Sequence, residues 1–157
     1  MTMPHQASEI HWVHGLAPVA DAFAGATVNS DVVKANCEAV LFLVYKGVGT
    51  TGTSTITVEA CDDATPTNTT AIPFYSRDNT TSDTWGDWTS RAAAGYLTTA
   101  GSNHIYQIWV DTAELAEEGY EYVRLDMAES VDDPVLGGIM IGLINPRYKP
   151  QPATVLT

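Results

Sequence analysis

The stretches EAVLFLVYK at residues 38–46 and STITVEAC at residues 54–61, joined by a glycine-rich turn, decide the fold class of this chain. The first is an apolar run of strand length, which is typical of a central strand buried on both faces. The second alternates, with Ile56, Val58 and Ala60 on one face and Thr or Glu on the other, as in a half-exposed antiparallel strand. The glycines between the two stretches predict a hairpin.

Further strand patterns lie on both sides of this pair. They are predicted at residues 26–34 (as one bent strand or two short ones), 71–76, 83–89, 103–111, 120–127 and 135–144. Residues 120–127 alternate, so Val123, Leu125 and Met127 are expected to face inward. This strand is expected to pair with the one before it, at residues 103–111.

Helical periodicity is almost absent from the sequence. One helical turn is predicted at residues 112–118, with Asp111 or Thr112 as its N-cap. About seven short strands separated by turn-rich segments favour two packed antiparallel sheets. The sequence therefore predicts an all-β chain, an antiparallel two-sheet β-sandwich that is jelly-roll-like or Ig-like.

The prolines and glycines divide the chain into three parts. Residues 1–24 are predicted to form an extended, irregular N-terminal leader that lies over the sheet or over a neighbour. Residues 25–144 form the sandwich domain. Residues 145–157 contain three prolines, which disfavour regular structure, and are predicted to be an extended C-terminal arm.

Charge and hydropathy exclude several classes of function. Nineteen acidic residues oppose seven Lys and Arg, a formal net charge of −12 that repels a phosphate backbone, so direct binding of nucleic acid is not expected. The N-terminus lacks the basic and apolar regions of a secretory signal, which favours a protein made in the cytoplasm. The most apolar run, residues 135–144, is about half as long as a membrane-spanning helix and is interpreted as a buried strand, with no membrane anchor expected.

The two cysteines, Cys37 and Cys61, flank the predicted hairpin at nearly matching distances. In a reducing cytosol such residues are expected to be free thiols. Their placement leaves a cross-strand disulfide open as the alternative.

The segment GVGTTG at residues 47–52 matches the glycine spacing of a dinucleotide-binding fingerprint. That fingerprint requires a helix after the glycines, whereas residues 54–61 have the alternation of a strand. Thr53 also stands where a phosphate-binding loop needs a lysine. We therefore interpret the segment as a turn whose glycines supply positive φ, and we expect no cofactor.

Neither a metal site nor a catalytic centre is predicted. Among the four histidines only His11 and His14 are closely spaced, and a zinc site needs about three or four convergent ligands. The acidic pairs at residues 62–63 and 132–133 are typical of solvated turns, with calcium binding as the alternative. No pattern of an activated serine or cysteine nucleophile is present, so the chain is not expected to be an enzyme.

Several aromatic residues gather in the loop-rich middle of the chain, among them Tyr75, Trp85, Trp88 and Tyr96. Such side chains, when exposed, stack on sugar rings or anchor a protein partner, and otherwise they belong to the core. The segment WGDW at residues 85–88 is the most favourable contact of this group.

Four segments resemble small virion proteins encoded beside the capsid genes of tailed bacteriophages and prophages. They are PVADAFAG (residues 18–25), SDVV (residues 30–33), YKGVGTTGTSTITVEACDD (residues 45–63) and Pro66. The resemblance implies a capsid decoration or cement protein, a β-sandwich that binds the capsid exterior, bridges capsid subunits and is located in the virion.

The implied partners are the major capsid protein, copies of this chain in a homo-oligomer on the particle, or both. The residues expected to contact them are Trp12, Phe23, Trp85, Trp88, Arg147, Tyr148 and Lys149. Two alternatives remain open, a carbohydrate-binding β-sandwich module that uses the loop aromatics, and a structural component of the phage tail or neck.

Overall fold

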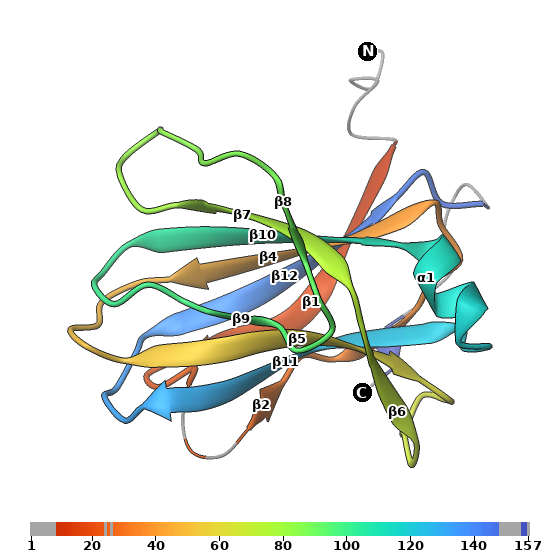
Figure 1. The fold of residues 1–157 in the computed structure, drawn as a ribbon, viewed down its shortest axis with the longest axis horizontal. Helices are drawn as coiled ribbons and strands as arrows, with labels where there is room; N and C mark the ends of the chain where they lie inside the picture. Colours follow the sequence, from red (N-terminus) through yellow and green to blue (C-terminus); the bar gives the residue numbers. More distant parts are fainter. Residues whose placement is uncertain (1–8, 24, 26, 148–154, 157) are drawn as a thin grey trace.

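The computed structural model describes residues 9–23, 25, 27–147 and 155–156. Two antiparallel sheets pack against each other, which confirms the predicted all-β sandwich (Figure 1). The elements in chain order are β1 (Ile10–Val19), β2 (Val28–Asn29), β3 (Val32–Lys34), β4 (Ala39–Lys46), β5 (Thr53–Cys61), β6 (Thr69–Ile72), β7 (Phe74–Asn79), β8 (Thr89–Arg91), β9 (Tyr96–Leu97), β10 (His104–Asp111), α1 (Thr112–Glu117), β11 (Tyr122–Val131), β12 (Gly137–Ile144) and β13 (Val155–Leu156).

The six-stranded sheet, called sheet A below, has the order β1-β12-β4-β10-β7-β8. The seven-stranded sheet, called sheet B, has the order β13-β3-β11-β5-β6, with β2 paired to β11 and β9 paired to β5. The apolar strand β4 lies inside sheet A between β12 and β10, so its predicted central position is confirmed.

The core lies between the sheets and is built from alternate residues of each strand. Sheet A contributes side chains such as Phe42 and Ile141, and sheet B contributes Ile56, Val58 and Leu125, all fully buried. Burying each of these side chains stabilises the fold by roughly 1.5–3 kcal/mol. The predicted inward faces of residues 54–61 and 120–127 are confirmed.

Two predicted pairings are wrong. Strand β11 pairs with β5 in sheet B, whereas β10 lies in sheet A, so residues 120–127 do not pair with residues 103–111. Strands β4 and β5 lie in different sheets, so the glycine segment that joins them crosses between sheets and is not a hairpin. Alternation marks the buried face of a strand but carries no information on which strand lies beside it.

The leader predicted at residues 1–24 contains a strand of the domain. Strand β1 is antiparallel to β12 at the edge of sheet A, so the irregular structure expected there is wrong for Ile10–Val19. Gly15 allows the close approach, because a Cβ on it would lie 2.9 Å from side-chain carbons of Ile139 and Ile141. The pairing register shifts before and after Leu16, and Pro18 lies in the second irregularity, where an edge strand tolerates proline.

The loop-rich middle differs most from the prediction. Pro73 divides the strand expected at residues 71–76 into β6 in sheet B and β7 in sheet A. The strand expected at residues 83–89 is wrong except at its last residue, because β8 begins at Thr89. The strand expected at residues 26–34 is present as two short strands, β2 and β3, which is one of the two expected alternatives.

The helical turn is confirmed as α1, with Asp111 as its N-cap. Figure 1 shows α1 at one end of the sandwich, where it connects β10 in sheet A to β11 in sheet B.

Strand β13 pairs with β3 at the edge of sheet B, so two residues of the predicted C-terminal arm join a sheet.

Candidate functional site

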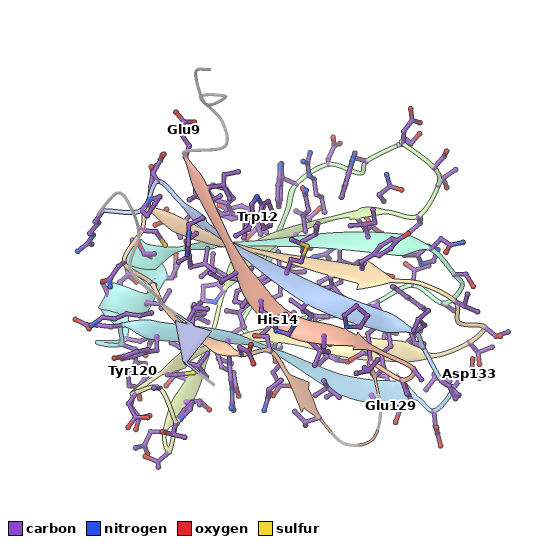
Figure 2. All side chains as sticks on the ribbon, turned by 180° about the vertical axis from the view of Figure 1, so that it is seen from behind. Glu9, Trp12, His14, Tyr120, Glu129 and Asp133 are labelled. Atoms are coloured by element: carbon purple, nitrogen blue, oxygen red, sulfur yellow. The ribbon has the colours of Figure 1, made fainter. Side chains whose placement is uncertain are left out.

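The outer face of sheet A presents three rows of outward residues that continue across its strands. One row runs through Trp12, Gly142, Leu41, Trp109 and Tyr75, as the register of β1, β12, β4, β10 and β7 requires. The next row runs through His14, Met140, Leu43, Gln107 and Arg77, and a third through Gly138, Tyr45 and Ile105. We call these residues together the apolar face; Figure 2 shows two of them, Trp12 and His14, on β1.

Several large side chains of the apolar face are open to solvent. Tyr45 is 54% exposed, Met140 49% and Trp12 43%. The prediction that residues 38–46 are buried on both faces is therefore wrong at Tyr45, and the prediction that residues 135–144 form a buried strand is wrong at Met140. Sheet A is an outer layer of the sandwich, so the second apolar face of β4 and β12 is not covered by the other sheet.

The outer face of sheet B has the opposite character. It presents Thr57 and Glu59 from β5 beside Arg124 and Asp126 from β11. Arg124 Nε donates to Glu59 Oε2 at 2.7 Å, and burial together with the Glu59 carboxylate raises the pKa of Asp126. This face has the polar and charged surface that antiparallel sheets normally present to water.

Acidic residues are almost absent from the apolar face, in a chain that has nineteen. Among the described residues, Asp111 at the end of β10 is the single acid at an outward position of a sheet A strand. Asp31, in the loop between β2 and β3, approaches the face from the side: its Oδ2 lies 3.3 Å from Nδ1 of His14. The face thus combines large apolar side chains with very low charge, the composition of an interface core.

A groove of about 440 Å³ lies over the β1, β12 and β4 part of the face. Its lining includes His14, Leu16, Pro18, Leu43, Tyr45, Leu136 and Met140. Glycines shape the surface around it. A Cβ on Gly138 would lie 2.9 Å from the Leu16 carbonyl oxygen, and one on Gly142 would lie 3.1 Å from the Trp12 ring.

A second hollow, of about 330 Å³, lies at the β10 and β7 end of the same face. It is lined by Tyr75, Trp88 and Trp109. The Trp88 and Trp109 rings meet edge to face, with centroids 6.5 Å apart. Arg77 places its guanidinium carbon 4.8 Å from the Trp85 ring centroid and 4.6 Å from that of Trp88, so it lies within cation–π distance of both rings.

The backbone amides of the glycine segment at residues 47–52 bind a carboxylate of the same chain, that of Asp133. Asp133 Oδ2 accepts hydrogen bonds from the amides of Thr50 (3.2 Å), Thr51 (2.7 Å) and Gly52 (3.2 Å). These bonds, led by that of Thr51, lower the pKa of the Asp133 carboxyl. The amides that a bound phosphate would need are therefore already occupied.

The predicted reason for these glycines is wrong. The glycines of this segment are not among the described glycines with positive φ, which are Gly25, Gly95, Gly101 and Gly119. Gly52 is required for close approach instead, because a Cβ on it would lie 2.3 Å from the Asp133 carbonyl oxygen. The chain crosses between the sheets at this point and packs directly against residues 133–135.

Lys46 at the end of β4 is a buried cation, 1% exposed. Its Nζ donates to the carbonyl oxygens of Gly52 (2.8 Å) and Thr99 (2.9 Å) and lies 5.6 Å from the Phe23 ring centroid. Burial lowers its pKa, and the Asp133 carboxylate acts in the opposite direction. Lys46 therefore ties two loops together inside the fold.

Both cysteines are buried and free in the structure, so the alternative of a disulfide between Cys37 and Cys61 is wrong. Burial raises the pKa of Cys37 to about 11 and that of Cys61 to about 12. Each thiol is consequently protonated at neutral pH, and a protonated thiol is a poor nucleophile and metal ligand.

Within the described part of the chain, no group of three or more His, Cys, Asp and Glu side chains is arranged to hold a metal ion. The same residues contain no helix long and apolar enough to cross a membrane.

The residues expected to contact a partner fall in different places. Trp12 lies on the apolar face, and Trp85 and Trp88 lie at its β7 end. Phe23 is 1% exposed and belongs to the core, so a partner cannot reach it and its assignment is wrong. Arg147 is exposed near Cys37 and Glu38 at the α1 end, whereas Tyr148 and Lys149 lie outside the described residues.

Sequence reasoning missed Tyr45, Met140 and Trp109 as surface residues. The sequence does carry a signal for Tyr45 and Met140, since each stands in an apolar run that predicts a buried strand. An apolar run on a sheet with only one covered face is a signal for a second, intermolecular layer.

Comparison of the chain with protein-family models, with curated proteins and with solved structures finds no match.

Proposed function

We propose that this chain is a non-enzymatic structural protein of a virion, of the capsid decoration type, which binds the capsid exterior through the β1, β12 and β4 part of the apolar face of sheet A. The observation that carries the proposal is the contrast between the two outer faces of the sandwich. One is mainly charged and polar, and the other is mainly apolar and almost free of acids.

The apolar face has the composition of a protein–protein interface. Exposed Trp, Tyr and Met side chains, such as Trp12, Tyr45 and Met140, are enriched in interface cores, where charged residues are depleted. Covering a side chain of this size contributes roughly 1.5–3 kcal/mol to association. The groove beneath Tyr45 and Met140 would receive apolar side chains of the partner.

The resemblance to small virion proteins supports a capsid as the partner. Two of the resembling segments, at residues 18–25 and 45–63, meet on the apolar face, because Pro18 and Tyr45 both line its groove. The chain carries a net charge of −12, so its copies repel one another. Contacts with capsid subunits, or with sister copies in a homo-oligomer on the particle, are therefore directed to the apolar face, where acidic residues are almost absent.

The first experiment is cosedimentation of the purified protein with undecorated capsids from the same source, with copy number counted at saturation. Saturable binding at a fixed ratio to the capsid subunit is expected. The double variant Tyr45→Asp/Met140→Asp should bind at least about tenfold more weakly, because each new carboxylate would be desolvated in the contact.

The matched control is Thr55→Asp/Thr57→Asp, which adds the same charge to the outer face of sheet B and should bind as the wild type does. Absence of binding by the folded wild type would contradict the proposal. So would equal losses in the two double variants, since charge alone would then explain the effect. Sedimentation with isolated tails or necks, and not with capsids, would move the role to those structures.

A further inference from the structure

We propose that the β7 end of sheet A binds a neutral saccharide, a function beyond the capsid contact. The site consists of Tyr75, Trp88 and Trp109, which line the 330 Å³ hollow, together with Arg77, which contacts the Trp88 ring, and Trp85, which contacts Arg77. We call these five residues the aromatic platform.

The rings are placed as a saccharide-stacking surface requires. Tyr75 and Trp109 are directly opposite each other across β7 and β10, and Trp88 from the following loop meets Trp109 at an interplanar angle of 73°. Tyr75 and Trp88 are 50% and 42% exposed. A pyranose ring presents a face of C–H groups that packs on such a ring, while its hydroxyls stay in water or find hydrogen bonds.

The platform is also preorganised. The Arg77 guanidinium stacks on both Trp85 and Trp88, and Arg77 Nε donates to Gln107 Oε1 at 2.6 Å. The loop tryptophan is thus held by a side chain that is itself anchored on the neighbouring strand β10. Binding a ligand on rings that are already fixed costs little conformational entropy.

The surroundings favour a sugar that carries no charge. Ser90, which is directly opposite Tyr75, adds an exposed hydroxyl to the rim, and Gln107 contributes an amide. The net charge of −12 disfavours acidic polysaccharides. The groove at the other end of the face is lined mainly by aliphatic residues such as Leu43, Leu136 and Met140, and it contains no tryptophan, whereas two tryptophans line the hollow of the platform. The two ends of sheet A therefore suit different ligands.

The test is titration of the isolated full-length protein with cellohexaose, maltohexaose and chitohexaose, followed by calorimetry and by tryptophan fluorescence. Saturable binding of at least one oligosaccharide is expected. Trp88→Ala and Tyr75→Ala should each weaken that binding at least about tenfold, which corresponds to about 1.4 kcal/mol. Trp12→Ala is the matched control, because Trp12 lies on the same face with nearly equal exposure (43%) but at the other end. It should bind as the wild type does.

The proposal is overturned if none of the three oligosaccharides binds the folded protein at millimolar concentration. It is also overturned if Trp12→Ala weakens binding as much as Trp88→Ala does. If Trp88→Ala instead loses only cosedimentation with capsids, the platform belongs to the protein contact. The capsid experiment fails or succeeds independently, since Tyr45→Asp/Met140→Asp leaves the platform residues in place.

Discussion

Asp133 shows at the scale of one residue why a glycine motif is a poor guide to function. Its carboxylate accepts from the Thr50, Thr51 and Gly52 amides, so the chain itself supplies the anion that a phosphate-binding loop would take from a ligand. Backbone amides gathered in a turn attract a negative charge of any origin. Only the position of Asp133, far away in the sequence, decides which anion is bound.

Gly52 should be the least replaceable glycine of this segment. In Gly52→Ala the new Cβ would meet the Asp133 carbonyl oxygen and Val135, so we expect the free energy of unfolding to fall by roughly 1–3 kcal/mol. Gly47→Ala is the control, because its nearest neighbour, the Leu136 carbonyl oxygen, would be 3.3 Å away. Urea denaturation measures both. Equal losses would show that steric approach is not what selects glycine at position 52.

The lowered pKa of the Asp62 carboxyl predicts that the free energy of unfolding depends on pH. The Asn68 side-chain amide, with further donors from Thr67 and the Asn68 backbone, lowers its pKa from the ordinary 3.8 to about 2. A carboxyl whose folded pKa is lowered stabilises the fold above its unfolded pKa and loses this contribution as the pH falls through the folded value. Asp62→Asn should therefore have a lower urea midpoint than the wild type at pH 7 and lose this difference near pH 2.

Asp87→Asn, at an exposed acid, is the control for charge and should match the wild type across the same range. A difference between Asp62→Asn and the wild type that persists unchanged at pH 2 would contradict the assignment, because the Asp62 carboxyl of the wild type is about half protonated at a pH equal to its folded pKa and has lost most of this contribution.

Strand β1 shows at the scale of one element how a segment punctuated by Gly and Pro becomes part of a sheet. The interruptions fall where β1 crosses closest to β12 and where its register shifts. An edge strand tolerates such defects because only one of its sides is hydrogen-bonded. Residues that predict an irregular leader in isolation are therefore compatible with ten residues of strand.

Gly15→Val tests whether β1 packs on the sandwich. The added side chain would overlap Ile139 and Ile141, so the free energy of unfolding should fall by roughly 1–3 kcal/mol. Ala17→Val, at an exposed position of the same strand, should stay within about 0.5 kcal/mol of the wild type. Chemical denaturation of both variants decides, and a harmless Gly15→Val would mean that β1 does not lie close to β12.

The N-cap of α1 gives a second prediction at this scale. Asp111 accepts from the Ala113 amide at 2.9 Å, which satisfies one of the free N–H groups at the start of the helix. Asp111→Ala should cost about 1 kcal/mol of unfolding free energy, and Asp111→Asn, which keeps an acceptor oxygen, should cost less. Thermal and urea denaturation measure the difference, and equal losses in the two variants would argue against capping.

At the scale of the whole molecule, the two outer faces differ in polarity, and this difference can be measured without a partner. The neutral dye Nile red should bind the native protein on the apolar face and fluoresce. Tyr45→Asp/Met140→Asp should reduce this fluorescence, whereas Thr55→Asp/Thr57→Asp on sheet B should not. Equal fluorescence from both double variants would show that the dye, and hence the accessible apolar surface, lies elsewhere.

The sequence by itself determined the fold class, the inward residues of β5 and β11, the central position of β4 and the capped turn after β10. These properties are local, because the period of a strand and the hydrogen bonds of a cap are set by a few consecutive residues. Only the tertiary structure decided that β5 pairs with β11, that Phe23 is buried and that the outer side of β4 is open. Strand pairing uses backbone groups that every residue except proline has, so the choice of neighbouring strand depends on the packing of the whole chain. The same packing decides that Tyr45, Met140 and Trp12 meet on one surface.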